Sequence, residues 1–240
     1  IDGDDLVASL DGVSPGDRTH PETTPVIGDV ADAEVADRAV AAAVDAGHLR
    51  VVVANAGRAI DHAFTGQDDA DWATVHRSVL DGTRTVVRAA ARRMQADAEE
   101  ELAAGPDAVA SPRRVITTVP AAALTATAGG SASASAGGAV LSLTRTLARE
   151  LGGWGIRVNA VVVGHIETRL TQALPDGVAL PSRDHPGLPE PVRQMAAATT
   201  ALGRFGHPDE VAAVHAFLSG PGADYVTGAV IPVTGGLIGT

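Results

Sequence analysis

The stretch LSLTRTLARELGGWGIRVNAVVVG (141–164) passes from a helical pattern through a glycine-rich turn into a run of β-branched residues. The same alternation of helix and strand patterns recurs along the chain. Strands are predicted at 24–30, 49–57, 113–119, 156–164 and 227–236, and helices at 31–47, 69–101, 131–152 and 208–220. Strands that alternate with helices favour βαβ units. We therefore predict an α/β fold: a doubly wound parallel sheet covered by helices on both faces, in three αβα layers.

The composition limits the class of protein. The 240 residues suit one domain (1–240), and 45% apolar residues can form a sizeable core. A net charge of −11 disfavours nucleic acid as a partner. The absence of cysteine excludes disulfides, thiolate metal sites and a cysteine nucleophile, and the histidines lack metal-ligand spacing. The sequence shows neither a long apolar run nor a signal-peptide pattern, so we expect no membrane segment and a cytoplasmic location.

Two segments are predicted to be loops. Residues 102–112 make a longer connection than the fold needs, and residues 174–191 contain five prolines. A proline-rich excursion after a strand is where an α/β protein places a lid over its crevice. We expect this lid to span about 172–200, with a plain surface loop as the alternative.

Four motifs, in this order and spacing, resemble the short-chain dehydrogenase/reductase (SDR) family, and most closely its 3-oxoacyl-acyl-carrier-protein reductases. They are DVAD (29–32), NAG (55–57), and the segments 141–171 and 202–236. The resemblance begins near Val26 and runs to the C-terminus. It implies a Rossmann-like sheet whose first strand, turn and helix are missing from this sequence.

The resemblance also implies an NAD(P)(H) site at the carboxyl ends of the strands. Gly57 lacks a Cβ, so the backbone there can approach a ligand, although the NAG turn could instead only support the sheet. Asp29, at a predicted strand end, could accept hydrogen bonds from an adenine or a ribose. The implied cofactor-binding residues are Asp29, Val30, Asn55, Ala56, Gly57, Gly164, Ile166 and Thr168.

The sequence departs from the family at the catalytic positions. Active members use a Ser, a Tyr that exchanges the proton, a Lys four residues later that lowers the pKa of this Tyr, and often an Asn. These four positions fall, in that order, near Pro120, Ser133, Gly137 and Val79. All 18 basic residues are arginine and the single tyrosine is Tyr225, in a packing motif. No shift of the alignment restores the Tyr/Lys dyad, so no catalytic residue is assigned.

A second departure concerns the cofactor. The family's T-G-x-x-x-G-I-G turn, whose backbone amides hold the pyrophosphate, is not present in this sequence. In the family strand order 3-2-1-4-5-6-7, the strand at 24–30 would have no neighbour joining it to the strand at 49–57. We expect the chain to be part of a longer protein; alternatively, another chain or a rearrangement fills the gap. Either way, cofactor binding by this chain is in doubt.

Other residues offer partial chemistry. Thr118 is the nearest hydroxyl to the family's Ser position, and His165 could be a replacement acid or an ordinary loop residue. We interpret Ser131, Ser133 and Ser135 as small helix residues, because no neighbouring base is identifiable from the sequence.

Three functions follow. The first hypothesis is a non-catalytic subunit that assembles with an active SDR homologue through helices 69–101 and 131–152. The second is an NAD(P)H-dependent ketoreductase or dehydrogenase that works without the dyad. The third is a ligand-binding or regulatory protein with the same fold.

Overall fold

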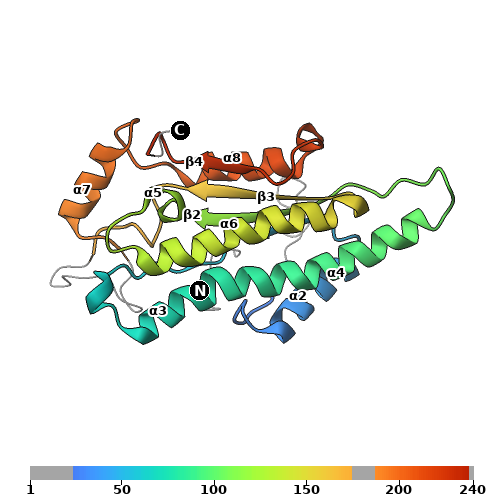
Figure 1. Cartoon of the computed structure of the whole chain (residues 1–240), viewed down its shortest axis with the longest axis horizontal. Helices are drawn as coiled ribbons and strands as arrows, with labels where there is room; N and C mark the ends of the chain where they lie inside the picture. Colours follow the sequence, from blue (N-terminus) through green and yellow to red (C-terminus); the bar gives the residue numbers. More distant parts are fainter. Residues whose placement is uncertain (1–23, 175–186, 238–240) are drawn as a thin grey trace.

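Four parallel strands, in the order β1-β2-β3-β4, form the sheet of the computed structural model, which describes residues 24–174 and 187–237 (Figure 1). The strands are β1 (Val51–Ala54), β2 (Arg113–Pro120), β3 (Ile156–Val163) and β4 (Val230–Val233). The register pairs Val51 with Arg114 in β2, Arg113 with Ile156 in β3, and Ala160 with Val230 in β4. The parallel α/β prediction is therefore confirmed.

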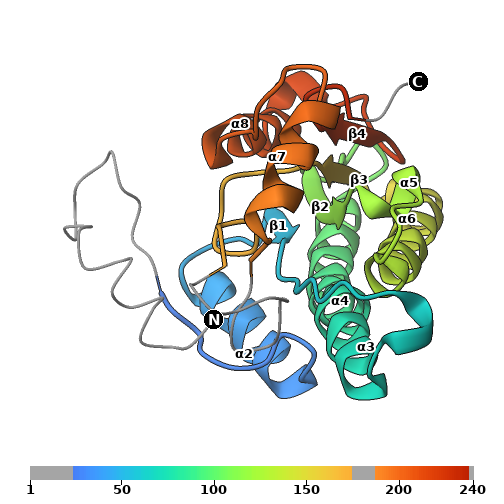
Figure 2. The ribbon, with the colours of Figure 1, turned by 90° about the vertical axis from the view of Figure 1, so that its left-hand side faces the viewer.

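Helices cover both faces of this sheet (Figure 2). On one face lie α3 (Asp69–His76), α4 (Gly82–Leu102) and α6 (Ser131–Leu151), with α2 (Ala33–Asp45) packed on α4, and on the other lies α8 (Pro208–Ser219). Shorter elements are η1 (Phe64–Gly66), α5 (Ala122–Thr125), η3 (Gly152–Trp154), α7 (Glu190–Thr199) and η4 (Pro221–Ala223). The helix predicted at 69–101 has the expected extent, but α3 and α4 are joined through a π-helical turn, η2 (Arg77–Asp81).

Helices α2 and α3 each begin at an aspartate whose side chain caps the first turn. The carboxylate of Asp32 accepts the N–H of Glu34 at 3.0 Å, and that of Asp68 accepts the N–H of Ala70 at 2.6 Å. Each bond satisfies an amide in the first turn that has no partner within the helix.

The core is built from small and β-branched residues, as the composition requires. Its members between the sheet and α4 or α6 include Val87, Met94, Val115, Val119, Val140, Val158 and Val162, and those beneath α8 include Ile116, Val161 and Leu218. Strands β2 and β3 are buried on both faces, which is why they appear in the sequence as continuous apolar runs.

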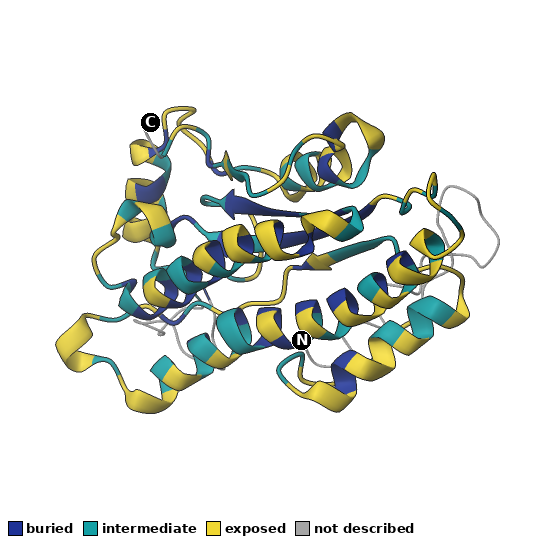
Figure 3. Ribbon diagram, turned by 45° about the vertical axis from the view of Figure 1, so that its right-hand side comes forward, coloured by how far each residue is buried: buried dark blue, intermediate teal, exposed yellow. Residues whose placement is uncertain are grey.

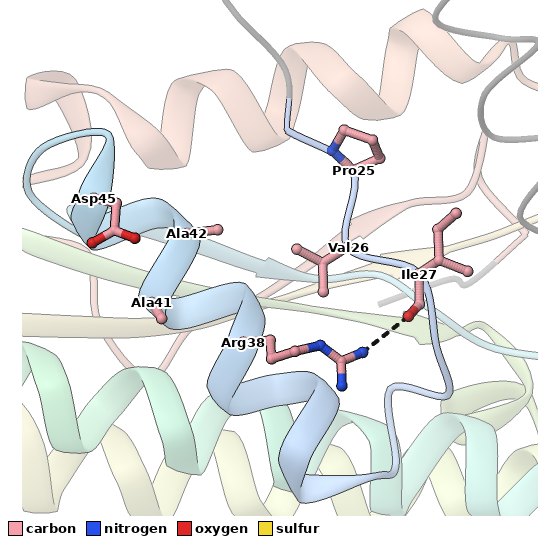
Figure 4. Close-up of a pocket in the computed structure, with 7 residues that line it drawn as sticks. All are labelled: Pro25, Val26, Ile27, Arg38, Ala41, Ala42 and Asp45. Carbon is pink, nitrogen blue, oxygen red and sulfur yellow. Dashed lines mark hydrogen bonds between the residues drawn. The ribbon is translucent and has the colours of Figure 1, made fainter.

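The strand predicted at 24–30 is wrong. Residues 24–30 form no strand and run beside α2, where Arg38 Nη2 donates to the carbonyl of Ile27 at 3.1 Å (Figure 4). A strand needs a neighbour for its backbone hydrogen bonds, and in residues 24–174 and 187–237 no strand pairs with this segment. Among the described residues, β1 is an edge strand and Val53 in it is 42% exposed.

The segment 25–27 and α2 enclose an open groove of about 610 Å³ (Figure 4). Its lining residues are Pro25, Val26, Ile27, Arg38, Ala41, Ala42 and Asp45. None of them is a predicted site residue, so this groove is distinct from the carboxyl-end site.

The predicted lid at 172–200 is described in part. Residues 175–186 lie outside the described residues, and α7 occupies 190–199. The last strand is shorter than the predicted 227–236. Within residues 24–174 and 187–237, no helix has both the length and the apolar character needed to cross a membrane.

Candidate functional site

The carboxyl ends of all four strands meet at one edge of the sheet, because the strands are parallel. Residues 55–57 follow β1, α5 follows β2, residues 164–168 follow β3, and residues 234–237 follow β4. The first turns of α6 reach the same edge, where Gly137 lies against Pro120 at the end of β2. The structure thus brings most of the predicted site residues into one region.

The NAG turn rests on the π-helical turn η2. A Cβ placed on Gly57 would lie 3.3 Å from Val79 Cγ2, and the N–H of Arg58 donates to Ser78 Oγ at 3.0 Å. Asn55, Ala56 and Gly57 are all exposed, so their backbone stays accessible. π-Helical turns are frequent at functional sites. The central residue of η2 is Val79, which is buried and apolar and stands at the family's Asn position.

Asp29 lies close to this turn, but both of its carboxylate oxygens already have partners. Oδ1 accepts the N–H of Ala31 at 2.8 Å, and Oδ2 accepts Nε of Arg77 at 2.8 Å. The backbone N–H of Ala31 and the Arg77 guanidinium lower the pKa of Asp29. Val30 packs on the start of α4, since a Cβ on Gly82 would lie 2.7 Å from Val30 Cγ2.

Ser133, at the family's Tyr position, is buried and donates to Asp61 Oδ1 at 3.1 Å. Asp61 is an exposed residue on the loop between β1 and η1, yet the protein around its carboxyl removes hydration and raises its pKa. The hydrogen bond from Ser133 acts in the opposite direction and favours the carboxylate. The pair therefore joins a hydroxyl to a carboxyl group that takes up a proton more readily than an ordinary aspartate.

The neighbouring serines of α6 make equivalent contacts. Ser131 donates to Gln67 Oε1 at 3.1 Å, and the hydroxyl of Ser135 lies 3.1 Å from His76 Nε2. His76 also stacks on Trp72, with ring centroids 4.5 Å apart. These three serines therefore form the polar contact between α6 and residues 61–76. The sequence interpretation of this row as small helix residues missed its polar partners.

Ser133→Ala is expected to raise the pKa of Asp61 further, because it removes the donor that stabilises the carboxylate. The free energy of unfolding should fall by about 1 kcal/mol, the usual net contribution of one such hydrogen bond. Carboxyl ¹³C NMR titration measures the pKa. Ser131→Ala is the control, since Ser131 bonds to Gln67 and not to Asp61. An unchanged Asp61 pKa in Ser133→Ala would contradict the geometry.

Gly137, at the family's Lys position, is buried in a tight contact. A Cβ added there would lie 2.9 Å from Ala123 Cβ, 3.1 Å from Val119 Cγ1 and 3.3 Å from Pro120 Cδ. The space into which a side chain would first extend is filled by α5 and the end of β2.

Thr118 is turned to the other face of the sheet. Its hydroxyl lies 3.0 Å from His215 Nε2 of α8, and His215 Nδ1 lies 3.0 Å from the carbonyl of Val211. A carbonyl oxygen can only accept, so His215 Nδ1 carries the hydrogen of its contact with Val211. The hydroxyl of Thr118 is thus committed to the packing of α8.

The segment after β3 is closely fitted to β4. The N–H of Gly164 donates to the carbonyl of Val233 at 3.0 Å, and a Cβ on Gly164 would lie 2.8 Å from Thr234 Cα. Ile166 forms a β-bridge with Gly206, while Thr168 is exposed and its N–H donates to Thr171 Oγ1.

His165 lies beside Phe205, which in turn contacts Arg193 of α7. Its ring stacks on Phe205, with centroids 5.4 Å apart, and burial lowers the pKa of His165. The Arg193 guanidinium lies 4.8 Å from the Phe205 centroid and 3.3 Å from the Glu167 carboxylate. Phe205 thus lies between His165, which follows β3, and Arg193 of α7, and links the two segments.

Comparison with known proteins decides the family. The family model described as enoyl-(acyl carrier protein) reductase matches residues 13–238. The chain belongs to the short-chain dehydrogenase/reductase family. This confirms the resemblance drawn from the four motifs, and the Rossmann-like fold with it.

Individual SDR relatives differ in how much of the chain they match. Galactitol 2-dehydrogenase (L-tagatose-forming) of Cereibacter sphaeroides is 34% identical over 211 residues, which is 88% of this chain and 74% of that protein. The 3-oxoacyl-acyl-carrier-protein reductase FabG of Thermotoga maritima is 44% identical over 99 residues, 41% of this chain and 35% of that protein. A solved gluconate 5-dehydrogenase from Burkholderia cenocepacia, in complex with NADP and tartrate, superposes with a TM-score of 0.73 at 25% identity, covering 88% of this chain and 74% of that one.

The SDR residues present here fit only part of a dinucleotide site. The turns at 55–57 and 164–168 occupy the predicted edge, but Asp29 already accepts from Ala31 and Arg77, and the sequence has no glycine-rich phosphate turn. The assignment of Asp29, Asn55, Gly57 and the 164–168 residues as cofactor ligands stays a prediction.

Asp61 is the chemically distinct residue that sequence reasoning on this SDR chain missed. It lies in no family motif, and a lone aspartate in a loop carries no periodic signal. Only the folding of the 58–68 loop over the start of α6 shows that it bonds to Ser133. The only signal in the sequence is that Asp61 is a carboxylate in the loop after β1, close to the NAG turn.

Proposed function

We propose that this chain is a non-catalytic partner subunit of an active SDR homologue, in a complex that reduces 3-oxoacyl thioesters with NAD(P)H. The observation that carries the proposal is Gly137, in a chain that contains no lysine at all. The family's lysine lowers the pKa of the catalytic tyrosine. Here that position is a glycine packed against Ala123, Val119 and Pro120.

The other catalytic positions support the same proposal. Ser133 is committed to Asp61, and Val79 is buried under the NAG turn. Tyr225 is fully exposed and follows Asp224, whose carboxylate bonds Arg114 at 2.6 Å near the amino end of β2. This tyrosine is therefore at the opposite end of the strands from the predicted site.

The retained parts of the fold suit an assembly role. The helices proposed for assembly, α3–α4 and α6, are intact, as is β4, although the positions for chemistry have changed. The substrate class comes from the names of relatives such as the Thermotoga maritima reductase. The complex is proposed to act in the cytoplasm, which suits a chain without cysteine.

The test is purification of the chain from its native host, followed by NADPH-dependent turnover of a β-ketoacyl thioester. We expect a Tyr/Lys-containing SDR homologue to co-purify and turnover to occur only in the complex. A positioned general acid typically contributes about 10²–10⁴-fold, so the isolated chain should fall below the complex by at least that factor. Turnover by the chain alone at the rate of the complex would overturn the proposal.

One observation favours a second candidate, a reductase that works without the dyad. Asp61 has a raised pKa and shares a hydrogen bond with Ser133 at the family's Tyr position. In that case the isolated chain turns over substrate, and Asp61→Asn abolishes the activity. Thr118 and His165, the alternatives suggested by the sequence, are instead engaged by His215 and Phe205.

A further inference from the structure

Ser135 of α6 and His76 of α3 form a hydroxyl–imidazole contact, and neither residue stands at a predicted catalytic or cofactor position. α6 is buried on one face against the sheet and exposed on the other (Figure 3). Ser135 is exposed, and its Oγ lies 3.1 Å from His76 Nε2. His76 is half-buried and is the last residue of α3, which packs against α6. The structure thus places an imidazole nitrogen within hydrogen-bonding distance of an accessible serine.

The imidazole of His76 is oriented by two contacts with Trp72. His76 Nδ1 lies 3.1 Å from the carbonyl oxygen of Trp72. A carbonyl oxygen can only accept, so Nδ1 carries the hydrogen, and in the neutral ring Nε2 presents its lone pair to Ser135. The ring also stacks on the indole, with centroids 4.5 Å apart and planes 23° apart. Both the tautomer and the direction of the ring are therefore set by Trp72.

These contacts have the geometry of an activated serine nucleophile. A serine hydroxyl is a weak nucleophile, and an adjacent base that a third group orients activates it. Here the base is His76 and the third group is the carbonyl of Trp72. The Ser135 hydroxyl also lies 3.1 Å from the carbonyl of Ala132, so its single hydrogen has two acceptors. Of these two acceptors only the imidazole is a base at neutral pH, so it alone can remove the hydrogen.

We propose that Ser135, with His76 as its general base, accepts the acyl group of an activated acyl ester. Ser135 Oγ bonds to the acyl carbon while its hydrogen passes to His76 Nε2. The bond from that carbon to the leaving group then breaks, the leaving group departs with the electron pair, and His76 returns the proton to solvent. The product is a seryl ester. Because Ser135 is exposed, water solvates the oxyanion, and the expected gain is that of a positioned base alone, about 10²-fold. This activity goes beyond the partner-subunit function and does not depend on it.

The first experiment treats the isolated chain with p-nitrophenyl acetate. The absorbance of p-nitrophenolate reports its release, and mass spectrometry of the digested protein locates the acetyl group. Ser142 is the internal control, since it is an exposed serine of the same helix whose hydroxyl has no hydrogen-bond partner among the described residues. We expect Ser135 to be acetylated at least ~10-fold faster than Ser142. Equal rates at the two serines would overturn the proposal.

The second experiment removes the base and keeps the contact. The side chain of His76→Gln can still bond to Ser135 but has no basic nitrogen, so acetylation of Ser135 should fall about 10²-fold. His48→Gln is the matched control, because His48 is an exposed histidine outside α3 and α6, and its loss should leave the rate unchanged. Thermal unfolding checks that both variants are folded. Acetylation of Ser135 at the wild-type rate in folded His76→Gln would overturn the proposal, as would an adduct that forms equally fast in Ser135→Ala.

Discussion

Glu101→Ala is expected to lower the free energy of unfolding by about 3 kcal/mol, because it leaves a buried arginine without its counter-charge. Arg113 is 1% exposed, and its Nη1 and Nη2 donate to Glu101 Oε2 at 3.1 Å and Oε1 at 2.9 Å. Glu101 Oε2 also accepts the N–H of Ser111 at 2.6 Å. The carboxylate thus ties the end of α4 to the start of β2 and fixes the long connection between them. Chemical denaturation measures the change.

The matched control is Glu100→Ala. Glu100 is the preceding residue, is exposed and has no described partner, so its removal should change stability by no more than about 0.5 kcal/mol. Arg113→Met should cost less than Glu101→Ala, because it removes the buried charge itself and leaves Glu101 in contact with solvent. Equal stability of the Glu101→Ala and Glu100→Ala proteins would contradict this account.

The pH dependence has a definite sign. The Arg113 guanidinium and the N–H of Ser111 lower the pKa of Glu101 from 4.5 to about 2. A carboxyl group whose pKa is lowered on folding contributes stability above its unfolded pKa and loses it as the pH falls through the folded one. The difference between wild type and Glu101→Ala should therefore be full at neutral pH and shrink between about pH 4.5 and 2.

The sequence predicted the parts of this fold that depend on local pattern. The buried runs at β2 and β3 and the amphipathic helices α2, α6 and α8 occur where the periodicity placed them. The strand predicted at 24–30 does not form because, among the described residues, no strand lies beside it to share backbone hydrogen bonds. Periodicity reports which residues are suited to a strand; it carries no information on whether another strand lies beside it.

The sequence likewise predicted the local parts of the candidate site but not its long-range contacts. Motifs located the loops at 55–57 and 164–168, and the composition alone excluded a catalytic lysine. The motifs did not indicate that Asp29 is held by Arg77, that Thr118 faces His215, or that Asp61 reaches Ser133. Each of these contacts joins residues far apart in the sequence, whose pairing is set by the tertiary fold rather than by spacing along a helix or strand.

Gly137→Lys, which restores the family's lysine in name, is expected to destabilise the protein by about 3 kcal/mol. Even the first carbon of a side chain would lie 2.9 Å from Ala123 Cβ, closer than real side-chain contacts allow, and overpacking of this kind costs about 1–3 kcal/mol. Moving the ammonium group past the buried surroundings of Gly137 adds a desolvation cost. The better helix propensity of lysine over glycine offsets less than about 1 kcal/mol of this.

Gly138 supplies the control for this prediction. It is the next residue of α6, yet no atom lies within 4 Å of a Cβ placed there. Gly138→Lys should therefore raise the free energy of unfolding by up to about 0.7 kcal/mol through helix propensity alone. In thermal or urea unfolding, the change in the free energy of unfolding relative to the wild type should be negative for Gly137→Lys and positive for Gly138→Lys.

If Gly137→Lys proves as stable as Gly138→Lys, position 137 has room for a lysine side chain. The proposed non-catalytic role would then rest on sequence alone, and Ser133→Tyr with Gly137→Lys should be tested for recovered turnover. With the position closed, that double variant gains no turnover, because the tyrosine would lack the cation that lowers its pKa.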